Sequence, residues 1–261
     1  MHGSVAGQGA APLAVVVALH DELATLRPLL SDAKRLDFSG RRAYRGQIGN
    51  RSVFMLATGM GASSARESSL LLMEEVKPGA VLATGFAGAT DRDLSTGDVV
   101  IGAPVIDDCS SSRGRLFDPH PELLEVATQS LNTPLTGAAG RLVTVDRVVA
   151  DPDSKARIRD EHDAIAIDME SAGVTRAANV YDTPIICARV IVDDANTNLP
   201  FDADRLIGPR GELRWFAASL YFLSRPALLS KIPSFHARCQ LARRNLATFV
   251  NQLISRIPTQ L

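Results

Sequence analysis

Residues 164–196, AIAIDMESAGVTRAANVYDTPIICARVIVDDAN, constrain the fold more than any other stretch of the chain. A short apolar run, AIAID, comes first, a segment with helical spacing follows, and a second apolar run leads directly into Asp193 and Asp194. This pattern predicts a strand, a helix and a second strand. Ligands bind at the carboxyl ends of strands in open α/β sheets, so Glu170 and Asp193 are the first candidates for chemistry.

The rest of the chain repeats the alternation of strands and helices, which indicates the α/β class. Residues 13–19 are a continuous apolar run that leads into a helical pattern, and Glu22 falls at the start of that helix. Its ordinary role there is that of an exposed acid favoured by the helix dipole. Further expected elements, in chain order, are a hairpin at 44–56, a helix at 62–75, strands at 80–83 and 99–107, a helix at 121–131, a strand at 141–145 and a helix beginning in 151–159.

Two glycine-rich segments, TGMG at 58–61 and TGFAGAT at 84–90, are expected to be loops that follow strands. A glycine turn at a helix N-terminus offers backbone N–H groups to an anion or a polar ligand. Gly59 and Gly85 are therefore candidates for binding, although a tight turn without a ligand is the alternative. The polar segment 107–121 is a candidate lid.

Length and composition bound the function classes. A chain of 261 residues that is 46% hydrophobic can bury one sizeable core, so we expect one domain with a tail. The formal net charge is −1, but residues 205–261 carry nine basic residues against Glu212 alone. The remainder is therefore acidic, which argues against a nucleic-acid-binding body and indicates that the tail has its own partner.

The cysteines and the N-terminus indicate a cytoplasmic protein. Cys109, Cys187 and Cys239 are widely spaced and form no C-x-x-C motif, so neither a metal site nor a disulfide framework is expected. Residues 1–12 are expected to be a flexible leader rather than a signal peptide. No apolar run reaches the ~18 residues that a membrane-spanning helix needs.

Several separated segments resemble the purine nucleoside phosphorylase and nucleosidase superfamily, and look closest to its methylthioadenosine/S-adenosylhomocysteine nucleosidase branch. They are ALHDELATLRPLL, TGMGASSA, KPGAVLATGFAGA, LSTGDVVI, AIDMESAGV and RVIVDDANTNLPFD, in this order between residues 13 and 202. The resemblance implies a three-layer α/β/α nucleoside phosphorylase-like fold at 13–204, with a central mixed, mostly parallel sheet and a helical extension at 205–261. It also implies a homo-oligomer that uses no cofactor or metal.

The same resemblance implies that the chain cleaves the N-ribosyl bond of an adenine nucleoside. Such a reaction passes through an oxocarbenium-like ribosyl cation, and adenine leaves poorly unless it is protonated. By analogy Asp193 is the general acid at purine N7, Glu170 binds the ribose hydroxyls with Met169 against the sugar, and Glu22 orients the attacking water. We expect burial, Glu170 and Glu22 to raise the pKa of Asp193.

The chain departs from the family pattern at several positions. Val192 replaces the serine that usually precedes the catalytic aspartate, and Phe86 replaces a serine in the second glycine-rich segment. Val148 stands where nucleosidases stack an aromatic ring on the base, and the backbone of Val149 is expected to contact adenine. Ala83 aligns with an arginine that holds phosphate in phosphorolytic relatives, so hydrolysis by water is favoured, with phosphate as the alternative co-substrate.

The tail mixes the apolar stretch 213–223 with the basic residues. This composition favours an amphipathic segment at an anionic membrane face, where each basic residue adds ~1 kcal/mol. The alternative is that the tail helices pack on the domain or on a partner subunit. Tail and body together resemble the hopanoid-associated phosphorylases, which implies adenosylhopane or another 5′-apolar adenosine as substrate and a location peripheral to the inner membrane.

Two other functions remain open at this point. One is a phosphate-dependent purine nucleoside phosphorylase, and the other is a non-catalytic nucleoside-binding, membrane-associated protein. The presence of Glu22, Glu170 and Asp193 together argues against the second, because a binding module has no need of an acid poised to protonate a leaving group.

Overall fold

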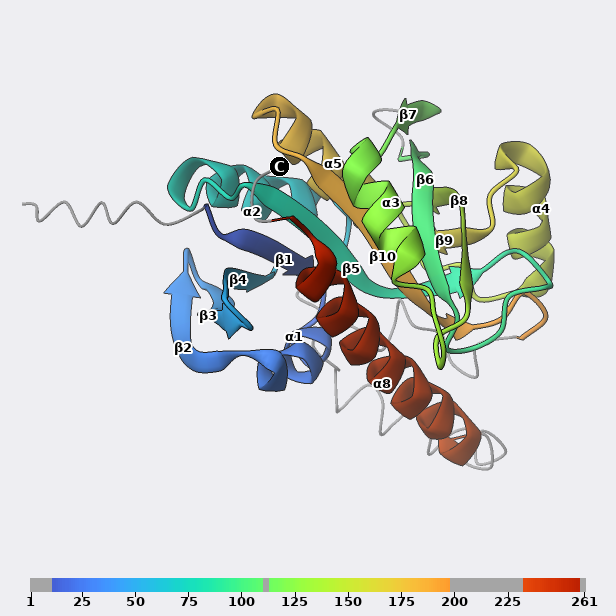
Figure 1. Cartoon of the computed structure of the whole chain (residues 1–261). Helices are drawn as coiled ribbons and strands as arrows, with labels where there is room; N and C mark the ends of the chain where they lie inside the picture. The colour runs from blue at the N-terminus through green and yellow to red at the C-terminus, as the bar shows by residue number, and fades with distance from the viewer. Residues whose placement is uncertain (1–10, 110–112, 198–231, 259–261) are drawn as a thin grey trace, which may run out of the picture.

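The computed structural model describes residues 11–109, 113–197 and 232–258 (Figure 1). In chain order, their elements are β1 (Leu13–Val17), α1 (His20–Leu26), the 3₁₀ turn η1 (Arg27–Leu29), β2 (Ser31–Phe38), β3 (Arg41–Ile48), β4 (Arg51–Ala57), α2 (Ala62–Glu75), β5 (Ala80–Ala89), β6 (Val99–Asp107), β7 (Arg115–Phe117), α3 (Pro121–Gln129), β8 (Gly137–Thr144), α4 (Pro152–His162), β9 (Ala166–Asp168), α5 (Ser171–Val180), β10 (Ile185–Asp193) and α8 (Ile232–Arg256). The expected alternation of strands and helices is confirmed.

The strands form one mixed sheet in the order β10-β6-β8-β9-β5-β1-β4-β3-β2, with β7 paired to β6. Because β5 also pairs with β10, five of the described strands close into a ring from which β1, β4, β3 and β2 extend. Strand β1 runs parallel to β4 and β5, and β10 runs parallel to β5. Strand β9 runs antiparallel to β5, so β9 and β10 point in opposite directions.

Helices cover both faces of the sheet, as the alternation of side chains along β1 illustrates. Leu13, Val15 and Val17 belong to a core beneath α1, α3 and α8, whereas Ala14 and Val16 belong to a second core beneath α2 and α5. All five side chains are buried. A strand with both faces covered needs a continuous apolar run rather than an alternating one, which is why this segment was recognisable in the sequence.

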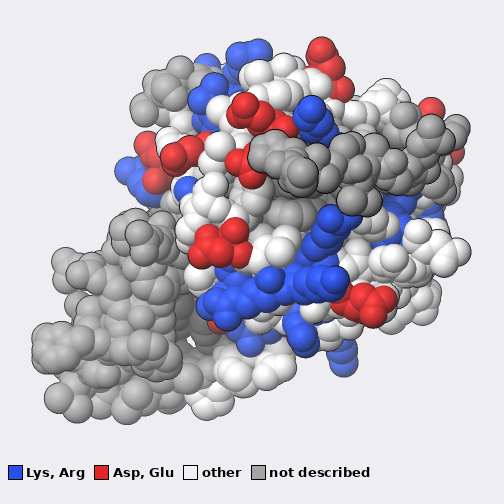
Figure 2. Space-filling view, turned by 90° about the vertical axis from the view of Figure 1, so that its left-hand side faces the viewer, with Lys and Arg blue, Asp and Glu red and all other residues white. Residues whose placement is uncertain are grey.

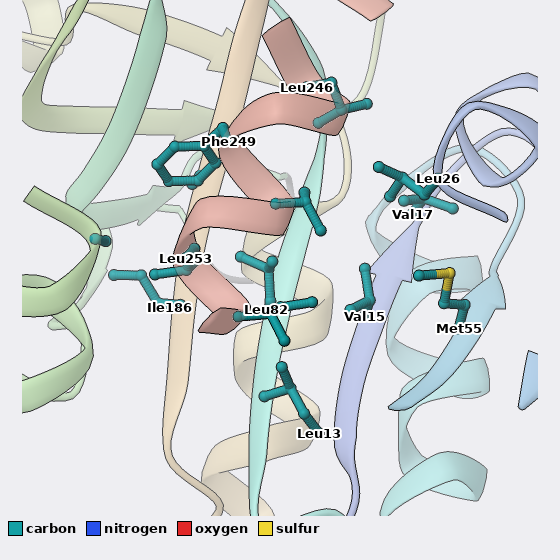
Figure 3. Close-up of a cluster of buried hydrophobic side chains, with 14 of the residues drawn as sticks. Leu13, Val15, Val17, Leu26, Met55, Leu82, Ile186, Leu246, Phe249 and Leu253 are labelled. Atoms are coloured by element: carbon teal, nitrogen blue, oxygen red, sulfur yellow. The ribbon is translucent and has the colours of Figure 1, made fainter. Parts of the chain in front are cut away.

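The C-terminal helix α8 lies on the first of these cores (Figure 3). Phe249 and Leu253 are 0% exposed and join a cluster that includes Leu82 and Ile186 from the central strands. Arg243 of α8 also forms an ion pair with Asp21 at 3.0 Å. The described part of the tail therefore packs on the domain, while the apolar stretch 213–223 lies outside the described residues.

None of the helices that the structure describes is long and apolar enough to cross a membrane.

The segment expected to be a second glycine-rich loop is instead part of β5, so that expectation was wrong. Residues 85–87 pair in register with residues 189–191 of β10, and Gly88 pairs with Asp193 after a register shift. A Cβ on Gly85 would lie 2.5 Å from Oε1 of Glu22, and one on Gly88 would lie 3.2 Å from Oδ2 of Asp193. The glycines therefore allow two carboxylates to approach a strand rather than allowing the chain to turn.

The segment proposed as a lid also contains regular structure. Strand β7 lies within it and pairs antiparallel with the end of β6. Residues 110–112 lie outside the described part, so the lid role stays a prediction.

The sheet ends in an open edge at β2. Lys34 on this strand pairs in register with Arg45 on β3, and Lys34, Arg35 and Arg45 are all exposed. Figure 2 views this side of the molecule and shows Lys and Arg side chains gathered in a band across it. Like charges on an edge strand oppose pairing with a second sheet.

Candidate active site

Glu22 is a buried carboxylate, not the exposed first-turn acid of the simplest interpretation. Its side chain lies in the turn between β1 and α1 and is only 2% exposed. Oε2 accepts hydrogen bonds from the backbone N–H groups of Ala18 and Leu19 at 3.0 and 2.8 Å, and Oε1 accepts one from Phe86 at 2.9 Å. Burial raises the pKa of Glu22, and Arg189 together with the three N–H donors opposes that rise.

Glu170 sits at the N-terminus of α5, where the chain leaves the short strand β9. Its Oε1 accepts a hydrogen bond at 2.9 Å from the N–H of Gly61, whose positive φ of 89° belongs to the first glycine-rich turn. Burial is the main cause that raises the pKa of Glu170 to about 7, with Asp168 and Glu22 adding to it and Arg189 opposing it. At neutral pH this carboxyl is therefore poised between its two protonation states.

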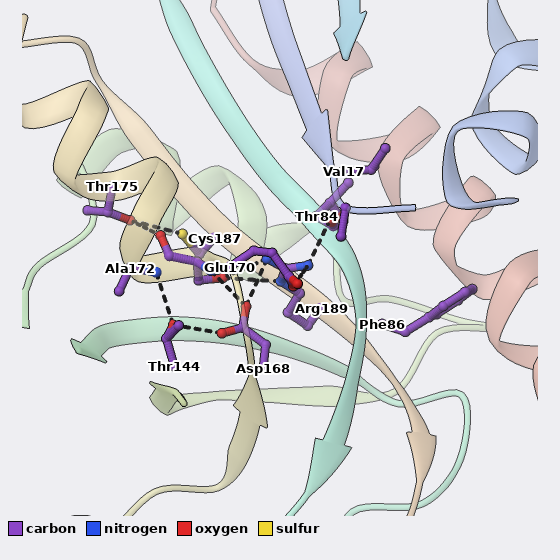
Figure 4. A network of polar contacts seen from close by, with 12 residues as sticks. Val17, Thr84, Phe86, Thr144, Asp168, Glu170, Ala172, Thr175, Cys187 and Arg189 are labelled. Atoms are coloured by element: carbon purple, nitrogen blue, oxygen red, sulfur yellow. Dashed lines mark hydrogen bonds and ion pairs between the residues drawn. The ribbon is translucent and has the colours of Figure 1, made fainter. Parts of the chain in front are cut away.

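The charge that connects these acids is Arg189 of β10, which the sequence reasoning missed (Figure 4). Its side chain is 1% exposed, and Nη2 lies 2.8 Å from Oδ2 of Asp168. Nη1 donates to the carbonyl oxygen of Thr84 at 3.0 Å and lies 3.9 Å from Oε2 of Glu170. A lone arginine inside the apolar run PIICARVIV was the available signal, since a buried guanidinium must be paired.

Asp168 is itself held in place by two donors from neighbouring elements. The hydroxyl of Thr144 donates to Oδ1 at 2.7 Å and the N–H of Ser171 donates to Oδ2 at 3.0 Å. The guanidinium of Arg189 also donates to the hydroxyl oxygen of Ser171. This network fixes β8, β9, α5 and β10 relative to one another beneath Glu170.

Asp193 lies farther along β10 than Arg189 and is 5% exposed. Its Oδ2 accepts a hydrogen bond at 2.5 Å from Nζ of Lys155, a residue of α4 that the sequence reasoning also missed. Burial raises the pKa of Asp193, while Lys155 and Arg238 oppose the rise and Asp194 adds to it. The charges acting on Asp193 are thus these three rather than Glu170 and Glu22, as had been expected.

The structure therefore brings Glu22 and Glu170 together around Arg189, with Asp193 on the same strand pair. A Cβ on Gly85 would meet both Glu22 Oε1 at 2.5 Å and Arg189 Nη1 at 2.9 Å. Gly88, which faces Asp193, comes three residues later on the same strand. The acids do not come from one parallel edge, as the strand–helix–strand pattern had indicated, because β9 is antiparallel to β10.

The remaining candidate residues surround this centre less tightly. Phe86 is half-buried against the core that α8 covers, and Met169 and Val148 are also half-buried. Val149 is buried in a small separate cluster with Val143 and Ile167. The N–H of Gly59 donates to the carbonyl oxygen of Ala18 at 2.9 Å, so the N–H that meets a carboxylate is that of Gly61.

A cavity of about 360 Å³ opens beside the end of β8. Of the candidate site residues only Val149 lines it, and its other lining residues are Asp108, Arg113, Val145, Asp146, Arg147, Ser154, Arg157, Ile158 and Glu161. The buried acids lie elsewhere, so we assign the chemistry to them and not to this cavity. Within the described ranges no cluster of three or more His, Cys, Asp or Glu side chains could hold a metal ion.

Comparison with known families decides the class of the protein. The model of the Phosphorylase superfamily matches residues 12–218. The chain belongs to the phosphorylase superfamily. It is an enzyme of the group that contains the purine nucleosidases and nucleoside phosphorylases.

Similar curated proteins of this superfamily are bacterial nucleosidases. The 5′-methylthioadenosine/S-adenosylhomocysteine nucleosidase of Haemophilus ducreyi is 29% identical over 198 residues, which are 70% of this chain and 85% of that protein. The protein of the same name from Tolumonas auensis is 29% identical over 203 residues, covering 72% of this chain and 88% of its own.

Solved structures share the fold of this superfamily member at lower identity. The 5′-methylthioadenosine/S-adenosylhomocysteine nucleosidase of Neisseria meningitidis, in complex with methylthio-immucillin-A, has a TM-score of 0.75 at 21% identity and covers 95% of this chain and 100% of its own. The futalosine hydrolase of Helicobacter pylori also has a TM-score of 0.75, at 16% identity, and covers 95% of this chain and 99% of its own. The nucleoside phosphorylase-like fold class expected from the sequence is thereby confirmed.

Proposed function

We propose that this phosphorylase-superfamily enzyme hydrolyses the N-ribosyl bond of an adenine nucleoside. Asp193 protonates the leaving purine, Glu170 accepts hydrogen bonds from the ribose hydroxyls, and Glu22 orients the attacking water. The observation that carries the proposal is the burial of three carboxyls, Glu22, Glu170 and Asp193, beside the paired strands β5 and β10, and this burial raises the pKa of each. Perturbed acids of this kind cluster at functional sites, and the curated relatives are named as adenosine-type nucleosidases.

The chemistry explains why the site needs an acid with a raised pKa. When the N-ribosyl bond breaks, its electron pair passes to the purine, and a proton from Asp193 turns the departing base into neutral adenine. A carboxyl with an ordinary pKa holds few protons at neutral pH. Burial raises the pKa of Asp193 and so favours the protonated form, while Lys155 opposes this rise.

Water is favoured over phosphate as the nucleophile because two arginines of the described residues, one among the acids and one at the separate cavity, already have partners. The guanidinium of Arg189 contacts Asp168, Ser171 and the backbone of Thr84. Arg113 is paired with Asp108 and Glu161 on the protein surface. Ala83 is buried and carries no group that could bind phosphate.

The proposal extends to a large apolar 5′ substituent, as in adenosylhopane. Half-buried Phe86 supports this, because the residue whose backbone N–H donates to Glu22 also carries a large apolar ring. A lipid-linked substrate also fits peripheral contact of the basic tail with an anionic membrane. We further propose that the enzyme works as a homo-oligomer in hopanoid biosynthesis.

The test is to incubate the enzyme with adenosine, 5′-methylthioadenosine and an adenosine bearing a long 5′ alkyl chain, with and without phosphate. Without phosphate we expect free adenine and a ribose that keeps its 5′ substituent, and the highest kcat/KM for the long alkyl chain. If no substrate releases adenine, the assignment of nucleosidase activity is wrong and a nucleoside-binding protein is the remaining interpretation. Strict dependence on phosphate, with ribose 1-phosphate as product, would overturn the assignment of water.

Substitution of the proposed acid tests its role. Asp193→Asn should lower kcat by at least ~100-fold, since it removes a general acid, while adenine still binds in a calorimetric titration. Asp194→Asn is the matched control, because the side chain of Asp194 accepts hydrogen bonds from Asn196 and Thr197 of its own turn and acts on Asp193 only through its charge. Equal loss in both variants would show that the acid is misassigned.

A further inference from the structure

Lys155 occupies a position that is unfavourable for a lysine in two ways. Its side chain is 1% exposed, and the residue lies at the end of the first turn of α4, four residues after the N-cap Asp151. Burial removes an ammonium from water, and the positive end of the helix dipole repels it. A strong local partner must therefore hold this charge in place.

The partners of Lys155 all come from the end of β10 and the turn that follows it. Nζ lies 2.5 Å from Oδ2 of Asp193, 2.7 Å from the carbonyl oxygen of Asp194 and 3.4 Å from the carbonyl oxygen of Thr197. An ammonium has three N–H donors, so these three acceptors satisfy it completely. Lys155 thus fastens the segment carrying the proposed general acid to a helix on the other side of the site.

This contact lies where the chain lacks the usual support for the acid. Val192, which precedes Asp193, has an apolar side chain that packs against the core beneath α8. It offers no hydroxyl to orient the carboxyl. Lys155 reaches the same carboxyl from α4 and donates to one of its oxygens, Oδ2.

We propose that Lys155 is the positioning residue of the reaction, which orients the carboxyl of Asp193 and stabilises the carboxylate that remains after proton transfer. This inference rests on the proposed nucleosidase function. In the transfer, the O–H bond of Asp193 breaks, an N–H bond forms on the purine, and the N-ribosyl electron pair goes to the base. The negative charge left on Asp193 then lies beside the ammonium of Lys155.

The pH dependence distinguishes this role from a purely structural one. The charged and titratable groups around Asp193 are Lys155 on α4, Arg238 and the Cys239 thiol on α8, and Asp194 directly after β10. Lys155 opposes the effect of burial, so removing its charge should raise the pKa of Asp193 further. Because a general acid is active only while protonated, the alkaline limb of kcat/KM should then move to higher pH.

The experiment compares Lys155→Gln, Lys155→Met and Lys155→Arg with wild type. Gln keeps N–H donors for the two carbonyls and protects folding, Met removes both donors and charge, and Arg keeps the charge. Lys34→Met on the exposed edge strand is the control. We expect Gln and Met to lower kcat by about 100-fold with KM changed less than about threefold, as for loss of orientation.

The alkaline limb of kcat/KM should move to higher pH in Lys155→Gln and Lys155→Met and stay near its wild-type position in Lys155→Arg. Lys155→Ala should recover part of the lost kcat when ethylammonium is added, which a loss of folding would not allow. A wild-type kcat and pH profile in Lys155→Gln would overturn the proposal.

Carbon-13 NMR titration separates this inference from the proposed function. The Asp193 carboxyl resonance, assigned by its absence in Asp193→Asn, should titrate at higher pH in Lys155→Gln than in wild type. This measurement needs no turnover. If no nucleoside releases adenine, the proposed function fails, but the titration still tests the interaction between Lys155 and Asp193. An unshifted titration in Lys155→Gln would overturn the role of Lys155.

Discussion

At the scale of a single residue, the proposed role of Glu170 and its environment favour different protonation states. To accept hydrogen bonds from ribose hydroxyls it must be ionised, yet burial and the nearby carboxyls Asp168 and Glu22 raise its pKa to about 7. The N–H of Gly61 and the guanidinium of Arg189 limit that rise. Substrate binding should therefore depend on pH near neutrality.

We predict that KM falls as pH rises through about 7, the pKa of Glu170, because the ionised form accepts two hydrogen bonds from the sugar. Glu170→Gln should raise KM and abolish this dependence. Steady-state kinetics from pH 5.5 to 8.5 check it, with the exposed Glu75→Gln as control. A flat wild-type KM over this range would contradict the assignment.

The free energy of unfolding should also depend on the protonation of Glu170. The folded state binds the Glu170 proton up to about pH 7, whereas the unfolded chain releases it near 4.5, so the wild-type free energy of unfolding should fall as pH rises through this window. Relative to Glu170→Gln, the loss is on the order of 3 kcal/mol for a shift of this size. Urea denaturation at pH 4.5 and 7.5 measures it.

Helix α8 acts as a structural element of the domain and not as an appendage. Its buried side chains include Leu246, Phe249 and Leu253, each 0% exposed. They pack against one face of β1, β5 and β10 (Figure 3). Glu22 lies just beyond the end of β1. Loss of this helix would expose the core directly behind the candidate site.

We predict that Phe249→Ala lowers the free energy of unfolding by about 3–5 kcal/mol, the usual result of emptying a buried aromatic position. Asn251→Ala, an exposed position two residues further along the helix, should change it by less than about 0.5 kcal/mol. Chemical denaturation followed by circular dichroism checks both. Similar values for the two variants would mean that α8 does not belong to the core.

At the scale of the whole molecule, charge is unevenly distributed. The basic band over β2 and β3 is exposed on one side (Figure 2), and the last 57 residues are strongly basic against an acidic remainder. Because α8 packs on the core, only part of that tail is left to serve a membrane. The apolar stretch 213–223 is the segment that the membrane proposal depends on.

We predict that the full chain floats with vesicles of phosphatidylglycerol and phosphatidylcholine, and not with phosphatidylcholine alone. Binding should weaken with added salt, since each basic residue contributes ~1 kcal/mol at an anionic surface. Replacing Trp215 and Phe216 by serine should reduce flotation without removing α8, unlike truncation of the tail. Equal flotation of this variant and the wild type would count against the role of the stretch.

Sequence patterns predicted the elements that are apolar on both faces and the helices that begin at a clear cap. The Asp-Pro start of α4 is an example, because Asp151 accepts a hydrogen bond from the N–H of Ser154 as an N-cap should. The prediction of a loop at TGFAGAT was wrong because glycine is common both in turns and at strand positions that another group approaches closely. Only the pairing of β5 with β10 distinguishes the two.

The candidate acids were recognisable from the family resemblance, but their supporting cations were not. Arg189 and Lys155 interact with residues distant in sequence, Asp168 and Asp193, across strands whose pairing no local pattern specifies. The same limit applies to the directions of β9 and β10. A strand–helix–strand pattern suggests a parallel pair, whereas both strands here pair with β5, in opposite directions.

The position of α8 has a consequence for how the protein is made. Arg243 contacts Asp21, 222 residues earlier, and Arg51 donates to the carbonyl oxygen of Pro258, 207 residues later. Strand β1 and helix α8 belong to one core, so the first described strand is covered only after α8 has been made. Such distant contacts slow folding and leave apolar surface exposed during synthesis. A chain arranged in this way completes this core only once α8 has been made, and its apolar surface stays exposed until then.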